Sequence, residues 1–266
     1  MKKVLITCRS DPAEGAWWEV YKLSSATFME YAKVHGYEYR DFFFEDVDAE
    51  KWPGIIRGRT PEWPFHPGRT SPCWLKIPII SMMLERYDAV LYLDNDCVIL
   101  DYSKDIAEEV PPLKWLAMSE CTSGDGTGPN CGVSFTRSVP MARNFWRDAW
   151  TVDYWMSARW TDQSQIFGLL GYRCAVPIEK IHPSQYDSGY HKLGVEWNDW
   201  TEAGVSHPWT RIYHAAWGPP AAGNKLGWMQ KALDTSEIVI HYRYLPLGDQ
   251  MLFSVWRILC LTRSKL

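Results

Sequence analysis

The sequence has no apolar run near the roughly 20 residues that a membrane-spanning helix needs. It also lacks an excess of basic residues, because 28 Lys and Arg stand against 32 Asp and Glu and the formal net charge is −4. General nucleic-acid binders depend on the attraction of basic residues for phosphates, so nucleic acid is not expected as a partner. With 46% apolar residues among 266, we expect a soluble globular protein with one large domain.

Cysteines are scattered and never form a CxxC pair, which argues against a disulfide framework and a structural zinc site. The sequence also lacks the GxGxxG and GxxxxGK(S/T) loops of dinucleotide-binding and P-loop enzymes. Polar residues from Thr7 onward end the apolar start of the chain too early for a signal peptide, so we expect a cytoplasmic protein. The seven cysteines are Cys8, Cys73, Cys97, Cys121, Cys131, Cys174 and Cys260.

Aromatic residues are abundant instead: 16 Trp, 14 Tyr and 9 Phe make up 15% of the chain. Flat rings with a polar edge suit core packing, and they also suit stacking on the apolar faces of sugars. Composition alone leaves both uses open.

The opening of the chain has the order of an α/β protein. Residues 2–9 are an apolar run that ends in polar residues, as a buried parallel strand does. Helical spacing follows over residues 16–34, Gly36 is a stop signal, and residues 37–44 predict a second strand. Strand, helix, strand is the unit of an α/β sheet. Further strands are expected at 89–93, 113–118 and 132–135, helices at 72–85, 139–150 and 162–170, and a long surface loop at 46–72.

The sharpest local feature is Asp94-Asn95-Asp96, which follows the apolar run 89–93 directly. Two carboxylates at i and i+2 leave the same side of an extended chain, so both can face one cation at the exposed end of a buried strand. The triplet therefore predicts a divalent metal ion. The alternative is an Asp-rich turn whose side chains accept hydrogen bonds from backbone amides.

Several motifs resemble GT-A fold glycosyltransferases, particularly the galactosyl-, mannosyl- and xylosyltransferase group with its DxD motif. A Trp-x-Lys opens a helix that leads to the metal-binding strand in that group, and here Trp74-Leu75-Lys76 precedes the triplet. The motifs appear in the family's order over residues 73–218, which is more specific than any one of them. The other three are Asn130-Cys131-Gly132, Trp160-Thr161-Asp162-Gln163 and Ile212-Tyr213-His214.

The resemblance implies a GT-A (Rossmann-like) α/β domain over residues 1–245, with an open, mostly parallel sheet flanked by helices. It implies a metal-dependent, retaining transferase of glycan biosynthesis that moves a hexose or pentose from a UDP- or GDP-linked donor to a saccharide acceptor. Asp96 and His214 would be metal ligands, with Asp94 on the metal or the ribose and His241 as the substitute for His214. A ligand set that combines carboxylates with an imidazole favours Mn²⁺ over Mg²⁺.

The resemblance also distributes the remaining roles. Asn130 and Gly132 would line the sugar site, and Lys76 and Lys225 would bind the diphosphate. The pair Asp162 and Gln163 would lie beneath the donor sugar and stabilise charge on the anomeric carbon, although Asp162 could equally be a helix cap.

Two further donor-binding residues follow from the expected sheet. Thr7 and Arg9 end the first strand. Ligands of open α/β sheets bind at the carboxyl ends of strands, so we expect the base and ribose of a nucleotide there.

Two alternatives remain open at this stage. A sugar nucleotidyltransferase also combines an α/β sheet with a carboxylate-bound metal. Such an enzyme is expected to have a Gly-rich loop near the first strand, but residues 7–15 of this sequence contain a single glycine, Gly15. A non-catalytic carbohydrate-binding protein could use the Trp-rich surface without nucleotide or metal.

Residues 246–266 are expected to form a C-terminal appendage. Residues 251–261 are apolar on nearly every face, and the basic Arg263 and Lys265 follow. Such a tail either docks on the domain, which we favour, or makes peripheral contact with a membrane that contains anionic lipid.

Overall fold

The computed structural model describes residues 1–9, 16–43, 46–47, 72–123, 126–151, 162–200, 207, 209–215 and 222–235. The chain divides into two compact units, Met1–Ser236 and Glu237–Leu266, and every helix and strand given below belongs to the first. The predicted appendage at 246–266, His241 and most of the predicted loop at 46–72 lie outside the described residues. The domain boundary at residue 245 therefore stays a prediction.

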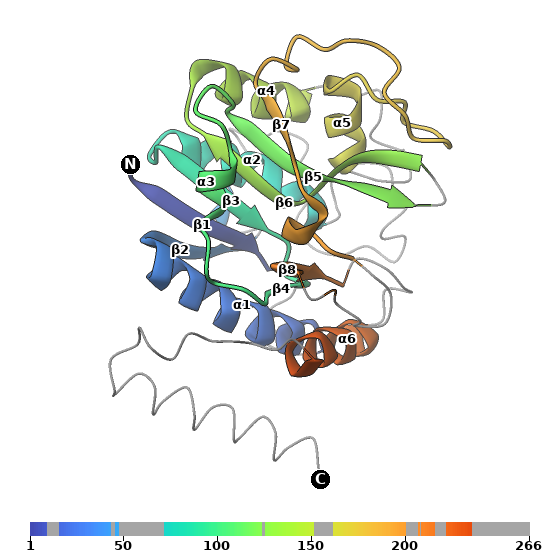
Figure 1. Ribbon diagram of the computed structural model, residues 1–266. Coiled ribbons are helices and arrows are strands. Elements are labelled where there is room, and N and C mark those ends of the chain that lie inside the picture. Colours follow the sequence, from blue (N-terminus) through green and yellow to red (C-terminus); the bar gives the residue numbers. More distant parts are fainter. Residues whose placement is uncertain are drawn as a thin grey trace. The chain divides into compact units, whose positions relative to one another are not determined.

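Six strands form the main sheet, in the order β2-β1-β3-β6-β5-β7 (Figure 1). β1 is parallel to β2 and β3, and β5 is parallel to β7, whereas β6 is antiparallel to both of its neighbours. The prediction of an open, mostly parallel sheet is therefore confirmed. The strands are β1 (Lys3–Cys8), β2 (Tyr37–Phe42), β3 (Ala89–Leu93), β5 (Leu116–Ser123), β6 (Gly126–Arg137) and β7 (Tyr190–Leu193).

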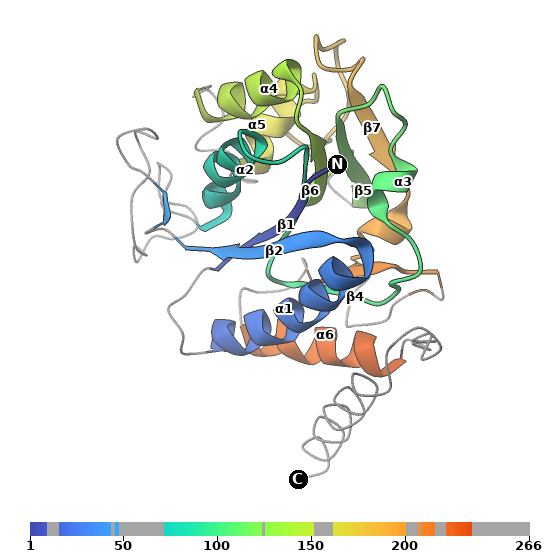
Figure 2. The same ribbon diagram turned by 90° about the vertical axis from the view of Figure 1, so that its left-hand side faces the viewer.

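Helices flank the sheet on both faces (Figure 2). One face packs against α2 (Lys76–Leu84), α4 (Pro140–Thr151) and α5 (Asp162–Leu169). The other face packs against α1 (Ala16–His35), and α6 (Ala222–Thr235) packs on α1. Among the described helices, none has both the length and the apolar character required to cross a membrane. The short helical segments are η2 (Pro72–Leu75), α3 (Ile106–Glu109) and η3 (Val195–Trp197).

A second, two-stranded sheet joins distant parts of the chain. β4 (Cys97–Ile99) pairs antiparallel with β8 (Ile212–His214), and Cys97 lies opposite His214 in the register. Val98 and Tyr213 face the other way, into a core that they share with α1 and α6. The small sheet is therefore held by apolar packing on one side, and its other side faces the end of β3.

The central strand β1 shows why the sheet is buried on both faces. Val4 and Ile6 pack toward α2 and α4, while Leu5 between them packs toward α1. Successive side chains of a strand point to opposite faces, so a continuous apolar run fills both cores. The strand predicted at 2–9 and the one predicted at 89–93 are confirmed as β1 and β3.

The predicted helices are confirmed, and two predicted strands were too short. Gly36 has a φ of +69°, the left-handed conformation that ends α1 as expected. The strand predicted at 113–118 begins at Leu116 and continues to Ser123, and the strand predicted at 132–135 extends over Gly126–Arg137. β5 and β6 form a hairpin, and the parts of it that were not predicted are rich in polar and glycine residues. Their backbones pair without the apolar pattern on which the prediction depended.

Candidate functional site

The Asp triplet lies at the carboxyl end of β3, in the turn that leads to β4. The backbone N–H of Asp94 donates to the carbonyl of Gly132 at 2.8 Å, and the N–H of Cys97 donates to the carbonyl of Asp94 at 3.1 Å. These bonds hold the turn against β6, beside the middle of the sheet. The predicted position of the triplet at the end of a buried strand is confirmed.

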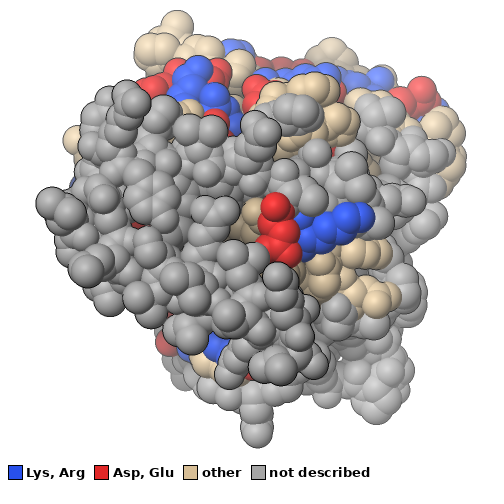
Figure 3. Space-filling model, turned by 60° about the horizontal axis from the view of Figure 1, so that its bottom comes forward, with Lys and Arg blue, Asp and Glu red and all other residues tan. Residues whose placement is uncertain are grey.

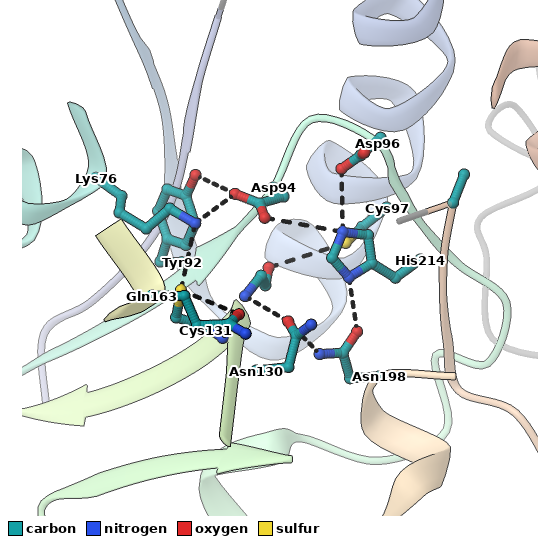
Figure 4. A network of polar contacts seen from close by, with 12 residues as sticks. Lys76, Tyr92, Asp94, Asp96, Cys97, Asn130, Cys131, Gln163, Asn198 and His214 are labelled. Carbon is teal, nitrogen blue, oxygen red and sulfur yellow. Dashed lines mark hydrogen bonds and ion pairs between the residues drawn. The ribbon is translucent and has the colours of Figure 1, made fainter. Parts of the chain in front are cut away.

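Four residues with potential metal-binding atoms meet at this turn, namely Asp94, Asp96, Cys97 and His214 (Figure 4). His214 Nε2 lies 3.2 Å from Asp96 Oδ1 and 3.8 Å from Asp94 Oδ2. Because Cys97 and His214 are register partners, it is the pairing of β4 with β8 that brings the imidazole to the carboxylates. Asp96, Cys97 and His214 are buried, and their ligand atoms lie within 4.8 Å of one another. The cluster can hold a cation.

Gly132 forms the wall of this cluster. A Cβ atom on Gly132 would lie 2.3 Å from His214 Cε1 and 2.8 Å from Asp94 Oδ2, so a side chain does not fit there. The register of β5 against β6 explains the close approach. Ser134 lies opposite Met118 and Asn130 lies opposite Ser119, so three residues of β6 lie between two successive partners on β5. Such a bulge bends a strand and redirects its backbone beside a site.

Lys225 supplies the positive charge nearest to Asp96. Its Nζ lies 2.5 Å from Asp96 Oδ2 and 2.6 Å from the carbonyl oxygen of Ala215. Burial by itself would raise the pKa of Asp96, but the positive charge of Lys225 opposes it, and that pKa is lowered strongly. Burial opposes the charge on Lys225 as well, and Asp96 nevertheless raises the pKa of Lys225. Both members of the pair are therefore charged.

Lys76 lies between two carboxylates, those of Asp94 and Asp162. Its side chain is only 3% exposed, and its Nζ lies 3.0 Å from Asp94 Oδ1 and 3.2 Å from Asp162 Oδ2. Burial opposes its charge, but Asp162 and Asp94 raise the pKa of Lys76 well above its usual value. The Tyr92 hydroxyl donates to Asp94 Oδ1 at 2.5 Å, on the same side.

Asp162 and Gln163 begin α5 and lie against the bulge of β6. Asp162 is buried, and Cys131 Sγ approaches its Oδ2 at 3.3 Å. Gln163 Oε1 accepts from the backbone N–H of Cys131 at 3.4 Å. The predicted pair is thus brought to the same end of the sheet as the Asp triplet, with Lys76 between them. A cap alone does not account for Asp162, because its carboxylate is paired with Lys76.

Thr7 and Arg9 occupy the end of β1, beside β3. Thr7 is buried, and its hydroxyl has no hydrogen-bond partner among the residues described. Arg9 Nε lies 2.8 Å from Asp41 Oδ2, and its guanidinium lies over the rings of Tyr21 and Phe43. The predicted site residues that the structure describes thus lie at one edge of the sheet. Arg9 contacts Asp41, Tyr21 and Phe43 there.

Sequence patterns missed three residues of the site, namely Tyr92, Cys97 and Asn198. Asn198 Oδ1 lies 2.9 Å from His214 Nδ1, and Asn198 Nδ2 donates to Asn130 Oδ1 at 2.9 Å. Tyr92 and Cys97 lie within apolar stretches of the sequence, where their polar atoms carry no signal. Asn198 belongs to no motif that the sequence displays.

Charged residues of both signs occupy the described surface. In the face shown in Figure 3, Lys and Arg side chains lie next to Asp and Glu side chains in the part that is described. Exposed pairs such as Lys22 with Glu19 are of this kind. This mixture fits the slightly negative net charge and gives no support to nucleic-acid binding.

The fold resembles solved glycosyltransferases, although the sequence matches no protein-family model and no curated protein. A glycosyltransferase involved in glycosylation of the major capsid of PBCV-1 aligns with a TM-score of 0.55 and 15% identity, over 86% of this chain and 99% of that one. The glycosyltransferase GlyE of Streptococcus pneumoniae TIGR4 aligns with a TM-score of 0.49 and 13% identity, over 86% of this chain and 61% of that one. Mouse xyloside xylosyltransferase 1 aligns with a TM-score of 0.45 and 11% identity, over 80% of this chain and 97% of that one.

The first of these three structures, with a TM-score above 0.5, has the same fold as this chain. The chain has the Rossmann-like fold of GT-A-type glycosyltransferases, as expected from its motifs. At 15% identity the likeness concerns the fold alone.

We predict that Gly132→Ala distorts the cluster of His214 and Asp94. Its Cβ would overlap both side chains, and overpacking of this kind costs about 1–3 kcal/mol. The melting temperature should fall by several degrees, and the affinity for Mn²⁺ in calorimetric titration should fall with it. Gly227→Ala is the matched control, because a Cβ there meets nothing within 4 Å and Ala favours the helix. Equal melting temperatures for the two variants would contradict the close packing at Gly132.

Proposed function

We propose that this protein is a metal-dependent glycosyltransferase that moves a hexose or pentose from a UDP- or GDP-linked donor to a saccharide acceptor. The observation that carries the proposal is the meeting of Asp94, Asp96 and His214 at the carboxyl end of β3. In open α/β sheets this is the edge at which ligands bind. The glycosyltransferase fold supports the same reaction class.

The donor atoms of the cluster fit a divalent cation. Two neighbouring ligands of an ion with bonds near 2.1 Å are about 3 Å apart when they bind at right angles. Asp96 Oδ1 and His214 Nε2 are 3.2 Å apart, and Asp94 Oδ2 is slightly farther from the imidazole. Lys225 already places a cationic group against Asp96. Two carboxylates and one imidazole favour Mn²⁺, with Mg²⁺ as the second choice.

Asp96 and His214 would hold this ion, with Asp94 as the third ligand or as a contact to the ribose. When bound, the ion neutralises the charge that develops on the leaving diphosphate. The chain itself prepares the site for an anion. Asp94, Asp96 and Asp162 face two ammonium groups, so with a neutral His214 the cluster lacks one positive charge, and a divalent cation would leave it net positive.

The sugar side of the site is assigned to α5 and the bulge of β6. Asp162 and Gln163 lie beside Cys131, and Asp162 also pairs with Lys76. We assign the two residues to stabilising positive charge on the anomeric carbon. Asn130 and Gly132 form the adjoining wall. Thr7 and Arg9 are assigned to the nucleotide, because they end the neighbouring strand.

The two lysines receive different roles. Lys225 is assigned to the diphosphate, as the sequence predicts, since its ammonium becomes available once a metal ion satisfies Asp96. The sequence predicts the same role for Lys76, but its Nζ is enclosed by Asp94 and Asp162. We therefore assign Lys76 to keeping those two carboxylates charged at close range.

The first test is Asp96→Asn, which we expect to abolish Mn²⁺-dependent binding of UDP or GDP and donor hydrolysis. The amide lacks the charge that attracts the ion, and it leaves Lys225 unpaired. Because an unpaired buried charge can cost about 3–5 kcal/mol, the double variant Asp96→Asn with Lys225→Met is measured beside it. Asp187→Asn is the control, since Asp187 pairs with Lys180 and neither residue belongs to β3, β4, β8 or α6. Unchanged metal-dependent nucleotide binding in a folded Asp96 variant would remove the basis of the proposal.

A second test separates the two cations that compete for Asp96. Without nucleotide, Lys225→Met should bind Mn²⁺ more tightly, by about tenfold or 1.4 kcal/mol, because no ammonium has to be displaced. The same variant should bind UDP or GDP more weakly in the presence of Mn²⁺. Calorimetric titration measures both affinities, with Lys231→Met, an exposed position of the same helix, as control. Weaker Mn²⁺ binding by Lys225→Met would show that the lysine supports the ion instead.

The third test is stereochemical. We expect the first-formed product to keep the anomeric configuration of the donor, because the Asn130, Gly132 and Asp162-Gln163 pattern resembles retaining enzymes. In that case the leaving phosphate can accept the proton of the acceptor hydroxyl. Proton NMR of the anomeric signal during the first turnovers decides, and an inverted signal would refute the retaining assignment.

A further inference from the structure

We infer that Asn198 is a positioning residue for His214: together with Asn130 it holds the imidazole proton on Nδ1 and turns the lone pair of Nε2 toward Asp96 and Asp94. This inference rests on the proposed function in one respect, namely that the Nε2 side is where a metal ion binds. The hydrogen-bond chain itself is a property of the protein without any ligand.

The chain of hydrogen bonds begins at a backbone N–H group, which fixes the direction of the first bond. The backbone N–H of Gly132 donates to Asn130 Oδ1 at 2.8 Å. A backbone amide nitrogen only donates, so the side-chain atom that it meets must be the oxygen of Asn130 and not its NH₂ group. The bulge of β6 therefore sets the orientation of the Asn130 amide.

The next bond transfers this orientation to Asn198. Asn130 Oδ1 lies 2.9 Å from the side-chain amide of Asn198, and because the oxygen only accepts, the NH₂ group of Asn198 must face it. The other end of that amide, Asn198 Oδ1, then faces His214 Nδ1 at 2.9 Å. An amide oxygen is again only an acceptor, so Nδ1 carries the proton.

The last consequence concerns Nε2. A neutral imidazole with its proton on Nδ1 has a lone pair on Nε2, and this atom lies 3.2 Å from Asp96 Oδ1 and 3.8 Å from Asp94 Oδ2. A lone pair beside two carboxylate oxygens is unfavourable unless a cation lies among them. The tautomer that would relieve this repulsion, with the proton on Nε2, is the one that the two amides exclude.

Burial and backbone pairing make this exclusion effective. Asn198 is 1% exposed, His214 4% and Asn130 7%, so water does not compete for these bonds. Two backbone bonds of Asp199, the residue that follows Asn198, tie this segment to β8: Asp199 N–H donates to the carbonyl of Ile212 at 2.9 Å, and His214 N–H donates to the carbonyl of Asp199 at 2.7 Å. The amide and the imidazole are thus kept at a set distance. Partners of this kind orient metal-binding histidines in general.

The test reads the tautomer directly, in the full chain without metal. Long-range proton–nitrogen NMR spectra of protein labelled with ¹⁵N-histidine distinguish protonated from unprotonated ring nitrogens, and the His214→Gln variant identifies the signals of His214. At a pH where the ring is neutral, we expect the proton on Nδ1 in the unaltered protein. A proton on Nε2 there would overturn the inference, whatever the metal does.

Substitutions at Asn198 then separate positioning from simple packing. Asn198→Leu has a similar size but no acceptor, so we expect the proton to move to Nε2 and the affinity for Mn²⁺ to fall about 10- to 100-fold. Asn198→Asp keeps an acceptor for Nδ1–H and should keep the tautomer and most of the affinity. Asn144→Ala, on the outer side of α4, is the control for loss of an amide. A lower melting temperature for Asn198→Leu with the proton still on Nδ1 would overturn the positioning role.

The outcomes also distinguish this inference from the proposed function. If the unaltered protein binds neither Mn²⁺ nor nucleotide but its His214 proton is on Nδ1, the function fails and the inference stands. If Mn²⁺ and nucleotide bind while the proton is on Nε2, the inference fails and the function stands.

Discussion

The site depends on the neutralisation of three carboxylates that lie close together at one edge of the sheet. Like charges repel strongly in a low-dielectric interior, so such a group persists only with cations among its members. Lys76 lies between Asp94 and Asp162, and Lys225 lies on Asp96. Each lysine is in the first four residues of a helix, α2 or α6, so the packing of these helices determines where the positive charges stand.

The backbone of β6 is the second element on which this arrangement depends. Its bulge brings Gly132 against His214 and Asp94, and the absence of a side chain at Gly132 lets the imidazole and the carboxylate approach the strand. The same segment presents Asn130 to Asn198 and Cys131 to Asp162. One irregular stretch of strand therefore contacts both the group around His214 and the group around Asp162, which couples their positions.

Local patterns predicted much of the fold and part of the site. Strand β1, helix α1 with its glycine stop, and the Asp triplet after β3 all follow from the order of apolar and polar residues over a few positions, which is why the sequence alone shows them. The full length of β5 and β6 was missed, because their paired ends are polar and have no apolar alternation. A lysine at the start of a helix is normally solvated, so the burial of Lys76 between two carboxylates could not be predicted either.

By itself the sequence determined the α/β order of elements and the strand-end carboxylates, from which a divalent cation is predicted. Only the tertiary structure decided which distant side chains join that group. Lys225 reaches Asp96 across 129 positions through the packing of α6, and His214 reaches it through the pairing of β8 with β4. Asn198 reaches His214 through the backbone bonds that tie the next residue, Asp199, to β8. The physical reason is that a local pattern reports contacts within a few residues, whereas strand register and helix packing are set by how the whole core fills its space.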